Sequence, residues 1–130
     1  MIQLIDATIS AGSFCLQDVS IHVPEGKYAV LMGPTGNGKT TILEAICGLR
    51  KVRRGRIFVG GCDVTTWAPG DRGIGYVPQD LALFPTMSVR EHLEFALRLR
   101  RASREQIVER TAAVAKQLGI ADLLNRSVHA

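Results

Sequence analysis

The chain has little of what marks several large classes of protein. No apolar run approaches the ~20 residues of a membrane-spanning helix, and the N-terminus lacks the basic segment and long apolar stretch of a secretory signal. Aromatic residues make up only 5% of the 130 residues. Because 46% of the residues are hydrophobic, the composition still indicates one globular domain, and we expect any membrane association to come through a partner.

Cysteine is also scarce, and its spacing is uninformative. Cys15, Cys47 and Cys62 form no C-x-x-C metal or redox pattern, so we interpret them as buried and reduced. With 16 Lys and Arg against 12 Asp and Glu, the net charge is +4. The basic clusters at 50–56 and 98–104 have no interleaved aromatic residues, which favours a solvated surface over a nucleic-acid interface.

The most informative stretch is residues 33–40, which matches the phosphate-binding pattern G-x-x-x-x-G-K-[ST] at every fixed position. The preceding segment, 28–32, is short and apolar and predicts a buried parallel strand. The following segment, 41–47, contains no helix breaker and ends at Gly48, which suits a helix C-terminus. This strand–loop–helix context favours phosphate binding over an ordinary glycine-rich turn.

The chemistry of such a loop assigns roles to its residues. Glycines let backbone N–H groups approach phosphate oxygens, and the following helix contributes the positive end of its dipole. We expect the Lys39 ammonium to reach the outer phosphates, the Thr40 hydroxyl to ligate Mg²⁺, and Thr41 to contact an inner phosphate. The expected nucleotide-binding residues are Gly33, Pro34, Thr35, Gly36, Asn37, Gly38, Lys39, Thr40 and Thr41.

Alternating and helical apolar patterns divide the rest of the chain into short elements. Ser88 with Glu91, and Ser103 with Gln106, form capping boxes that predict two helix starts. The apolar stripes that follow are interpreted as core packing, and Gly119 closes the second helix. Strands are predicted over residues 2–9, 16–23, 56–59, 62–64 and 74–77, of which the first two are antiparallel and the next two form a hairpin.

A P-loop alone does not distinguish kinases, GTPases and transport ATPases, but three further segments narrow the choice. Residues 16–20, shortly before 23–26, resemble the approach to the P-loop in ATP-binding-cassette (ABC) ATPases. Gly-Ile-Gly-Tyr-Val-Pro-Gln-Asp at 73–80 resembles their Q-loop, and residues 83–91 resemble the start of their helical subdomain. Order and spacing agree over residues 6–124, nearly the whole chain.

The resemblance implies an α/β chain with the P-loop NTPase fold of the ABC ATPase type, present in part: core strands and P-loop helix, an antiparallel β part and the start of the helical subdomain. Residues 1–130 then form the N-terminal portion of a single ATP-binding domain, cut before its signature motif. The implied function is the ATP-binding subunit of a membrane importer. The sequence of residues 72–85 is most similar to importers of the molybdate and sulfate group. A nucleotide-binding module of a non-transport ABC ATPase, in DNA repair or translation, is the alternative.

By the same resemblance, Lys39 and Gln79 are the catalytic residues and ATP and Mg²⁺ are the cofactors. Gln79 is placed near the attacking water, and it joins Thr40 as a metal ligand. The family usually stacks adenine on an aromatic residue just before the glycine at position 12, where this chain has Ala11. Phe14 is the nearby aromatic residue, and it is either the substitute or a core residue of a strand.

The partners implied are transmembrane permease subunits and a second ATPase subunit, as in a homodimer, with no nucleic acid. The protein would lie on the cytoplasmic side of the inner membrane, attached only through its partner. The family's catalytic Glu and switch His should follow Ala130, and His22, His92 and His129 fall at none of the switch positions. We interpret these histidines as surface or structural, and we expect the 130-residue chain alone to be inactive as an ATPase.

Overall fold

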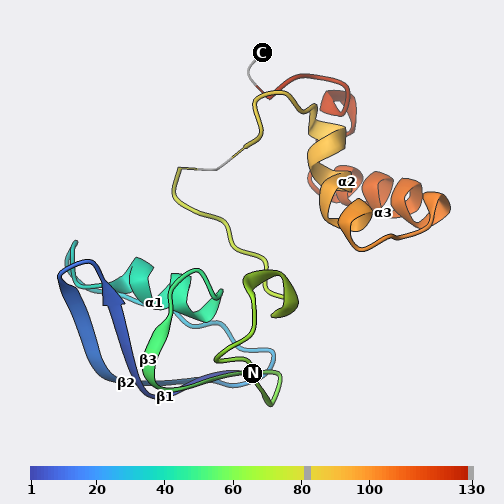
Figure 1. Ribbon diagram of the computed structural model, residues 1–130. Helices are drawn as coiled ribbons and strands as arrows, with labels where there is room; N and C mark the ends of the chain where they lie inside the picture. Colours follow the sequence, from blue (N-terminus) through green and yellow to red (C-terminus); the bar gives the residue numbers. More distant parts are fainter. Residues whose placement is uncertain (81–82, 129–130) are drawn as a thin grey trace. The chain divides into compact units, whose positions relative to one another are not determined.

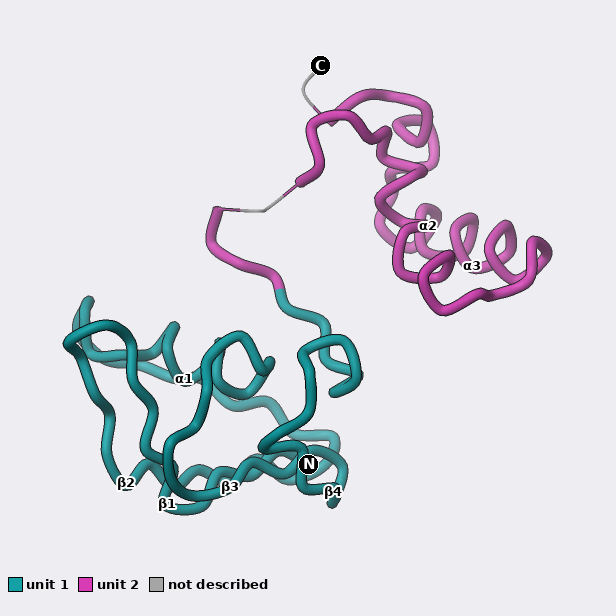
Figure 2. The backbone as a smooth tube through the Cα atoms, viewed as in Figure 1, with its two compact units in different colours: residues 1–76 teal, residues 77–130 magenta. Residues whose placement is uncertain are grey.

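A computed structural model describes residues 1–80 and 83–128 of the chain (Figure 1). The chain divides into two compact units, residues 1–76 and 77–130 (Figure 2). Among the described residues, the first unit holds a sheet and one α-helix, and the second holds two α-helices. No helix in the described ranges combines the length and apolar character that a membrane crossing requires.

The first unit is built on a four-stranded sheet in the order β2-β1-β3-β4. Strands β1 (Ile2–Ala11) and β2 (Phe14–Val23) pair antiparallel, and so do β3 (Val52–Val59) and β4 (Cys62–Asp63). β1 also pairs antiparallel with β3, which brings the two hairpins into one sheet. The predicted antiparallel strands and the predicted hairpin are therefore confirmed.

A bulge in β1 decides which of its side chains face the core. The pairing register shifts between Leu4 and Ala7, and Asp6 takes a positive φ of 46°. The Asp6 N–H donates to Ser20 Oγ at 3.0 Å, and the serine hydroxyl donates to the Asp6 carboxylate at 3.1 Å. Because the bulge shifts the alternation by one residue, the buried side chains are Leu4, Ala7 and Ile9.

Helix α1 (Lys39–Ile46) covers one face of this sheet, and the core lies between them (Figure 1). The helix has only 8 residues, a length at which an isolated helix is marginal in water. Its stability therefore depends on packing against the sheet. The buried apolar side chains of this core are Leu4, Ala7, Ile9, Ile42, Ala45, Ile57 and Val64.

The predicted strands at 28–32 and 74–77 are absent, because both segments lack regular secondary structure. The prediction that residues 28–32 are buried is also wrong, since Tyr28 is 101% and Met32 84% exposed. A parallel strand needs a neighbour that accepts and donates its ladder hydrogen bonds. The ladders among the described strands are all antiparallel, so these segments have no such neighbour there.

The second unit consists of helices α2 (Val89–Leu99) and α3 (Arg104–Gln117), followed by a short 3₁₀ turn at Ala121–Leu123. Both helices begin with the predicted capping boxes, at Ser88 and Ser103. Each box pairs the serine hydroxyl with one N–H of the first turn and the side chain at the third position with the serine N–H. The sequence prediction of these two helix starts is confirmed.

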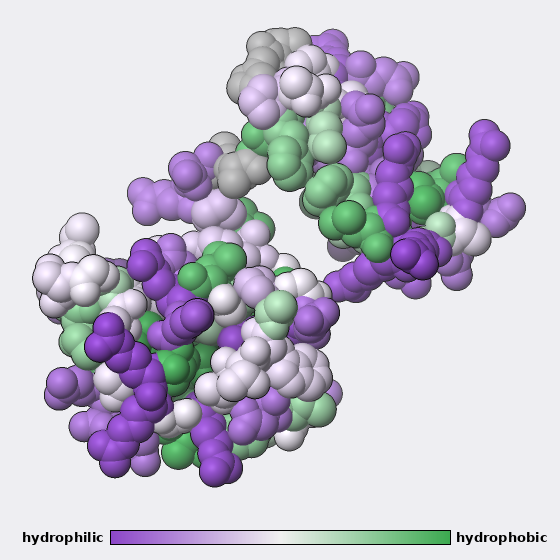
Figure 3. Space-filling view, in the orientation of Figure 1, coloured by the Kyte–Doolittle hydropathy of each residue, from purple (hydrophilic) through white to green (hydrophobic). Residues whose placement is uncertain are grey.

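Burial in the second unit is less complete than the apolar stripes predict. Thr111 and Ala115 of α3 are buried, but Val108 is 59% and Leu118 60% exposed. Figure 3 shows apolar side chains of the molecule reaching the surface among long charged ones. Two helices form only one contact face for each other, so part of the stripe is left without a packing partner among the described residues.

The cysteines are free, as expected, but they are not buried. Cys15 and Cys62 are exposed and Cys47 is half-buried. Cys15 lies on β2 and Cys62 on β4, and both are edge strands of the sheet. Their side chains therefore meet solvent instead of a second packed layer.

Gly55 tests the importance of the β1 bulge for the fold. It has a φ of +84°, and a Cβ there would lie 2.4 Å from the carbonyl oxygens of Ile5 and Asp6. Gly55→Ala should therefore lower the free energy of unfolding by about 3 kcal/mol, through overpacking against backbone and left-handed strain. Gly60→Ala is the matched control, because Gly60 has a φ of +58° and nothing within 4 Å. Urea unfolding of both variants measures the difference, and equal losses would contradict the role of the bulge contact.

Candidate functional site

The N-terminus of α1 presents a set of free backbone donors. Its N-cap is Gly38, with φ 80°, and no side chain caps the helix. The first carbonyl to accept a helical bond is that of Gly38, from the Ile42 N–H at 3.0 Å. The N–H groups of Lys39, Thr40 and Thr41 have no acceptor in the part of the chain that the structure describes. With the positive end of the helix dipole, these donors have the chemistry that attracts an anion.

The Lys39 side chain folds back over the same loop. Its ammonium donates to the carbonyl oxygens of Gly33 at 2.8 Å and Pro34 at 2.7 Å. The first turn of α1 contains no acidic residue, so no carboxylate of that turn competes for this charge. The loop therefore carries a cation beside the free N–H donors, as phosphate binding requires.

The structure brings the predicted loop residues together. Thr41 is 9% exposed, so most of its side chain is enclosed, while the Thr40 hydroxyl faces solvent with no hydrogen-bond partner among residues 1–80 and 83–128. The Asn37 N–H closes a turn to the Pro34 carbonyl at 3.4 Å. The exposed residues of the site are Gly33, Pro34, Thr35, Gly36, Asn37 and Thr40.

The start of β2 lies directly against this loop. A Cβ at Gly38 would be 2.8 Å from Cε1 of Phe14 and 2.7 Å from Cδ1 of Leu16. Only a residue without a side chain allows this approach. Phe14 is 40% exposed, so its ring contacts the loop and also remains accessible to a ligand. Sequence reasoning missed Leu16, although its spacing of two from Phe14 already placed both on one side of the strand.

Gln79 belongs to the second unit. It lies in a turn with Asp80, and its side chain is exposed. The downstream end of its loop is held by His92: the Phe84 N–H donates to Nε2 at 2.9 Å, and Nδ1 lies 2.8 Å from the Ser88 carbonyl. Since Nε2 accepts, the ring is assigned as the neutral tautomer with its proton on Nδ1.

Aromatic packing reinforces this anchor. The Phe84 ring lies 5.8 Å from the His92 ring and 5.1 Å from the Phe95 ring, measured between centroids. His92 is thus a structural histidine with both ring nitrogens engaged, as expected, and His22 is exposed on β2. His129 lies outside the described residues.

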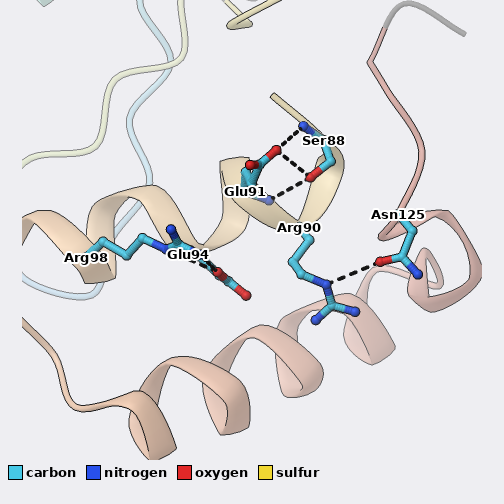
Figure 4. Close-up of polar contacts among 6 residues, drawn as sticks. All are labelled: Ser88, Arg90, Glu91, Glu94, Arg98 and Asn125. Carbon is cyan, nitrogen blue, oxygen red and sulfur yellow. Dashed lines mark hydrogen bonds and ion pairs between the residues drawn. The ribbon is translucent and has the colours of Figure 1, made fainter. Parts of the chain in front are cut away.

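The capping box at the start of α2 completes the anchor (Figure 4). The Glu91 carboxylate accepts from the Ser88 N–H at 2.7 Å and from its hydroxyl at 2.8 Å, and these bonds lower the pKa of Glu91. Arg90 points away from the box and donates to Asn125 at 3.4 Å. The loop that carries Gln79 therefore enters α2 at a fixed point.

The donor chemistry fits a hard cation beside a nucleotide. No group of three His, Cys, Asp or Glu residues within the described ranges could hold a metal ion. The predicted ligands are instead the Thr40 hydroxyl, in the first unit, and the Gln79 amide, in the second. Each is an exposed oxygen donor of the kind that Mg²⁺ accepts.

Comparisons with known proteins agree with this geometry. A family model described as ABC transporter matches residues 16–130. The chain is 43% identical over 113 residues to the molybdate/tungstate import ATP-binding protein WtpC of Pyrococcus abyssi. The aligned region covers 87% of this chain and 33% of that protein. It is 37% identical over 126 residues to the maltose/maltodextrin import ATP-binding protein MalK of Escherichia coli K12, with 96% and 34% covered. The chain thus spans about a third of the length of these curated relatives.

Solved structures show the same fold. A dimeric post-hydrolysis state of the ATP-binding cassette MJ0796 bound to ADP and Pi matches with a TM-score of 0.83 and 25% identity, over 99% of this chain and 62% of that chain. The ATP-binding subunit of an ABC transporter matches with a TM-score of 0.83 and 25% identity, over 98% and 54%. The predicted fold class is confirmed by these cassettes.

The anchor of the Gln79 loop can be tested at one side chain. His92→Phe keeps an aromatic ring against Phe84 but removes both ring nitrogens. We expect the Phe84 amide to lose hydrogen-exchange protection worth about 1 kcal/mol, because its acceptor is gone. Exchange followed by NMR measures this loss, with His22→Phe as the control that leaves the Phe84 amide unchanged. Unaltered protection in His92→Phe would show that the imidazole does not hold the loop.

Proposed function

Because this chain belongs to the ABC transporter family, we propose that it binds ATP with Mg²⁺ through residues 33–41, as part of the ATP-binding subunit of a membrane importer. One observation carries the proposal: free N–H donors at the start of α1 lie in the same loop as the Lys39 ammonium. A triphosphate tail pairs these donors and adds charge-assisted bonds to the lysine. Members of the family hydrolyse ATP.

We assign the nucleoside end of the ligand to Phe14. Its ring touches Gly38, the residue that begins α1, and it is accessible over 40% of its surface. This ring is thus an exposed aromatic face beside Gly38, where we place the phosphates to which the base is attached. Base–aromatic stacking tolerates different bases, so Phe14 adds affinity more than selectivity.

The catalytic roles fall to Lys39 and Gln79. When bound, Mg²⁺ neutralises charge on the outer phosphates. The Thr40 hydroxyl and the Gln79 amide are the oxygen ligands that we assign to it. The neutral Gln79 amide also orients the attacking water without adding charge, while Lys39 stabilises the charge that develops on the transferring phosphoryl group. Family membership, the exposed Gln79 side chain and the position of the half-buried Lys39 over the loop carbonyls support these roles.

The relatives support a proposal for the partners and the location. Both curated relatives named above are import ATP-binding proteins, which favours an importer over a role in DNA repair or translation. We propose that transmembrane permease subunits and a second copy of the ATPase are its partners, and that it lies on the cytoplasmic face of the inner membrane. The similarity to a molybdate/tungstate protein supports an oxyanion as the solute.

The phosphate site is tested by Lys39→Ala. Losing the ammonium removes charge-assisted bonds to the outer phosphates, so ATP binding should weaken by about 1.5–3 kcal/mol. Titration of labelled ATP with Mg²⁺ measures the change. Lys51→Ala is the control for net charge, because Lys51 is an exposed lysine that follows the other end of α1. Equal affinity of the wild type and Lys39→Ala would refute the site.

The stacking role of Phe14 predicts a split between two ligands. Phe14→Ala should weaken ATP binding by about 1–3 kcal/mol but leave the binding of inorganic tripolyphosphate unchanged, because that ligand has no base. Phe14→Tyr keeps the aromatic face and should restore ATP affinity. If Phe14→Ala weakens both ligands alike, Phe14 supports the loop instead of stacking the base.

A further inference from the structure

Arg72 lies at the end of α1 opposite to the phosphate loop, and it is only 6% exposed. Its guanidinium donates hydrogen bonds to four backbone carbonyls. Two belong to the last turn of α1, Ala45 at 2.8 Å and Ile46 at 2.9 Å. The other two follow β4 in the chain, Thr65 at 3.0 Å and Trp67 at 3.2 Å. One side chain therefore joins the end of the helix to the segment that leads toward Gln79.

Helix α1 lacks the usual stabilising residues at both of its ends. It has no side-chain N-cap, no acidic residue in its first turn and no basic residue in its last turn. Arg72 supplies from outside the helix both the donors and the positive charge that the C-terminal carbonyls need. Because the Ala45 residue is fully buried, solvent does not readily replace these bonds when they are lost.

The chain is shaped around this guanidinium. Gly48, just after the C-cap Cys47, has a φ of +83°, and a Cβ there would lie 2.7 Å from Nε and 3.0 Å from Cζ of Arg72. The guanidinium therefore packs directly on the helix end, and any residue larger than glycine at position 48 would displace it. Burial raises the pKa of the adjacent Cys47 thiol, and the charge of Arg72 opposes that rise.

We propose that Arg72 is a positioning residue for the nucleotide site. Gly38 against Phe14 and Leu16 fixes one end of α1, and the Arg72 fork fixes the other. Two anchors define the direction of a short rigid helix, and hence where its free N–H groups and the Lys39 ammonium point. Small errors of position weaken such multi-point contacts strongly. This inference rests on the proposed function, since it assumes that the loop binds phosphate.

Arg72→Lys is the first test. The ammonium keeps the charge but cannot form the planar fork to four carbonyls. We expect ATP to bind about tenfold more weakly, although Arg72 lies at the end of the helix away from the phosphates. Labelled ATP is titrated at a temperature where circular dichroism shows each variant to be folded. A purely structural role changes the melting temperature but leaves the affinity of the folded protein unchanged.

A second variant displaces the guanidinium without changing Arg72. Gly48→Ala places a Cβ against Nε of Arg72. Gly119→Ala is the control, because Gly119 has a similar left-handed backbone conformation but a Cβ there meets no other atom. Gly119 also follows a helix C-cap, Leu118 of α3, has a φ of +68°, and has nothing within 4 Å. Gly48→Ala should weaken ATP binding as Arg72→Lys does, and Gly119→Ala should not. If Arg72→Lys fails to fold, the comparison of Gly48→Ala with Gly119→Ala still tests whether Arg72 positions the nucleotide site.

The wild type and Lys39→Ala, titrated in parallel, separate the two ways in which the inference can fail. If Lys39→Ala binds ATP more weakly than the wild type, but Arg72→Lys and Gly48→Ala bind as the wild type does, Arg72 is structural only and the inference is overturned. If the wild type does not bind, or Lys39→Ala binds equally well, the proposed function is wrong, and the inference falls with it.

Discussion

The candidate site depends on one constraint, the seating of helix α1 on the antiparallel sheet. The helix is too short to be stable alone, and its own side chains cap neither end. Ile42 and Ala45 bury it against β1 and β3, Gly38 lets its N-terminus approach β2, and Arg72 holds its C-terminus. The N–H donors at the N-terminus stay free, since no side chain among residues 1–80 and 83–128 competes with a phosphate for them.

The sheet has to be irregular for this seating to occur. The β1 bulge at Asp6 turns Leu4, Ala7 and Ile9 to the same face, and the close approach of Gly55 to the bulge allows β3 to stay paired beside it. In a regular strand the Leu4 side chain would face opposite to those of Ala7 and Ile9, so the three could not share one core face. The second unit is ordered differently, by local capping at Ser88 and by the His92 contact that holds Phe84 at the entrance to α2.

Much of this organisation could be predicted from the sequence, and the failures have identifiable causes. Capping boxes and the P-loop involve residues close together in the chain, so a pattern of a few letters carries the whole interaction. Residues 28–32 have the apolar pattern of a buried strand, yet they are exposed and irregular. An apolar pattern indicates that the side chains of a segment favour burial. A strand also needs a neighbouring strand whose backbone pairs with its own N–H and carbonyl groups. The apolar stripe of α3 is half-exposed for a similar reason, because part of it has no packing partner among the described residues.

The sequence by itself determined the phosphate loop, the Lys39 charge, the helix starts and the family, because each depends on residue types at fixed short spacings. Only the tertiary structure decided that Phe14 lies against the loop, that Lys39 bonds to the carbonyls of its own loop, and that Arg72 holds the far end of α1. These contacts join segments that are distant in sequence or depend on how the chain turns. Their geometry follows from packing and from the demand that buried carbonyls find donors, and no local spacing encodes it.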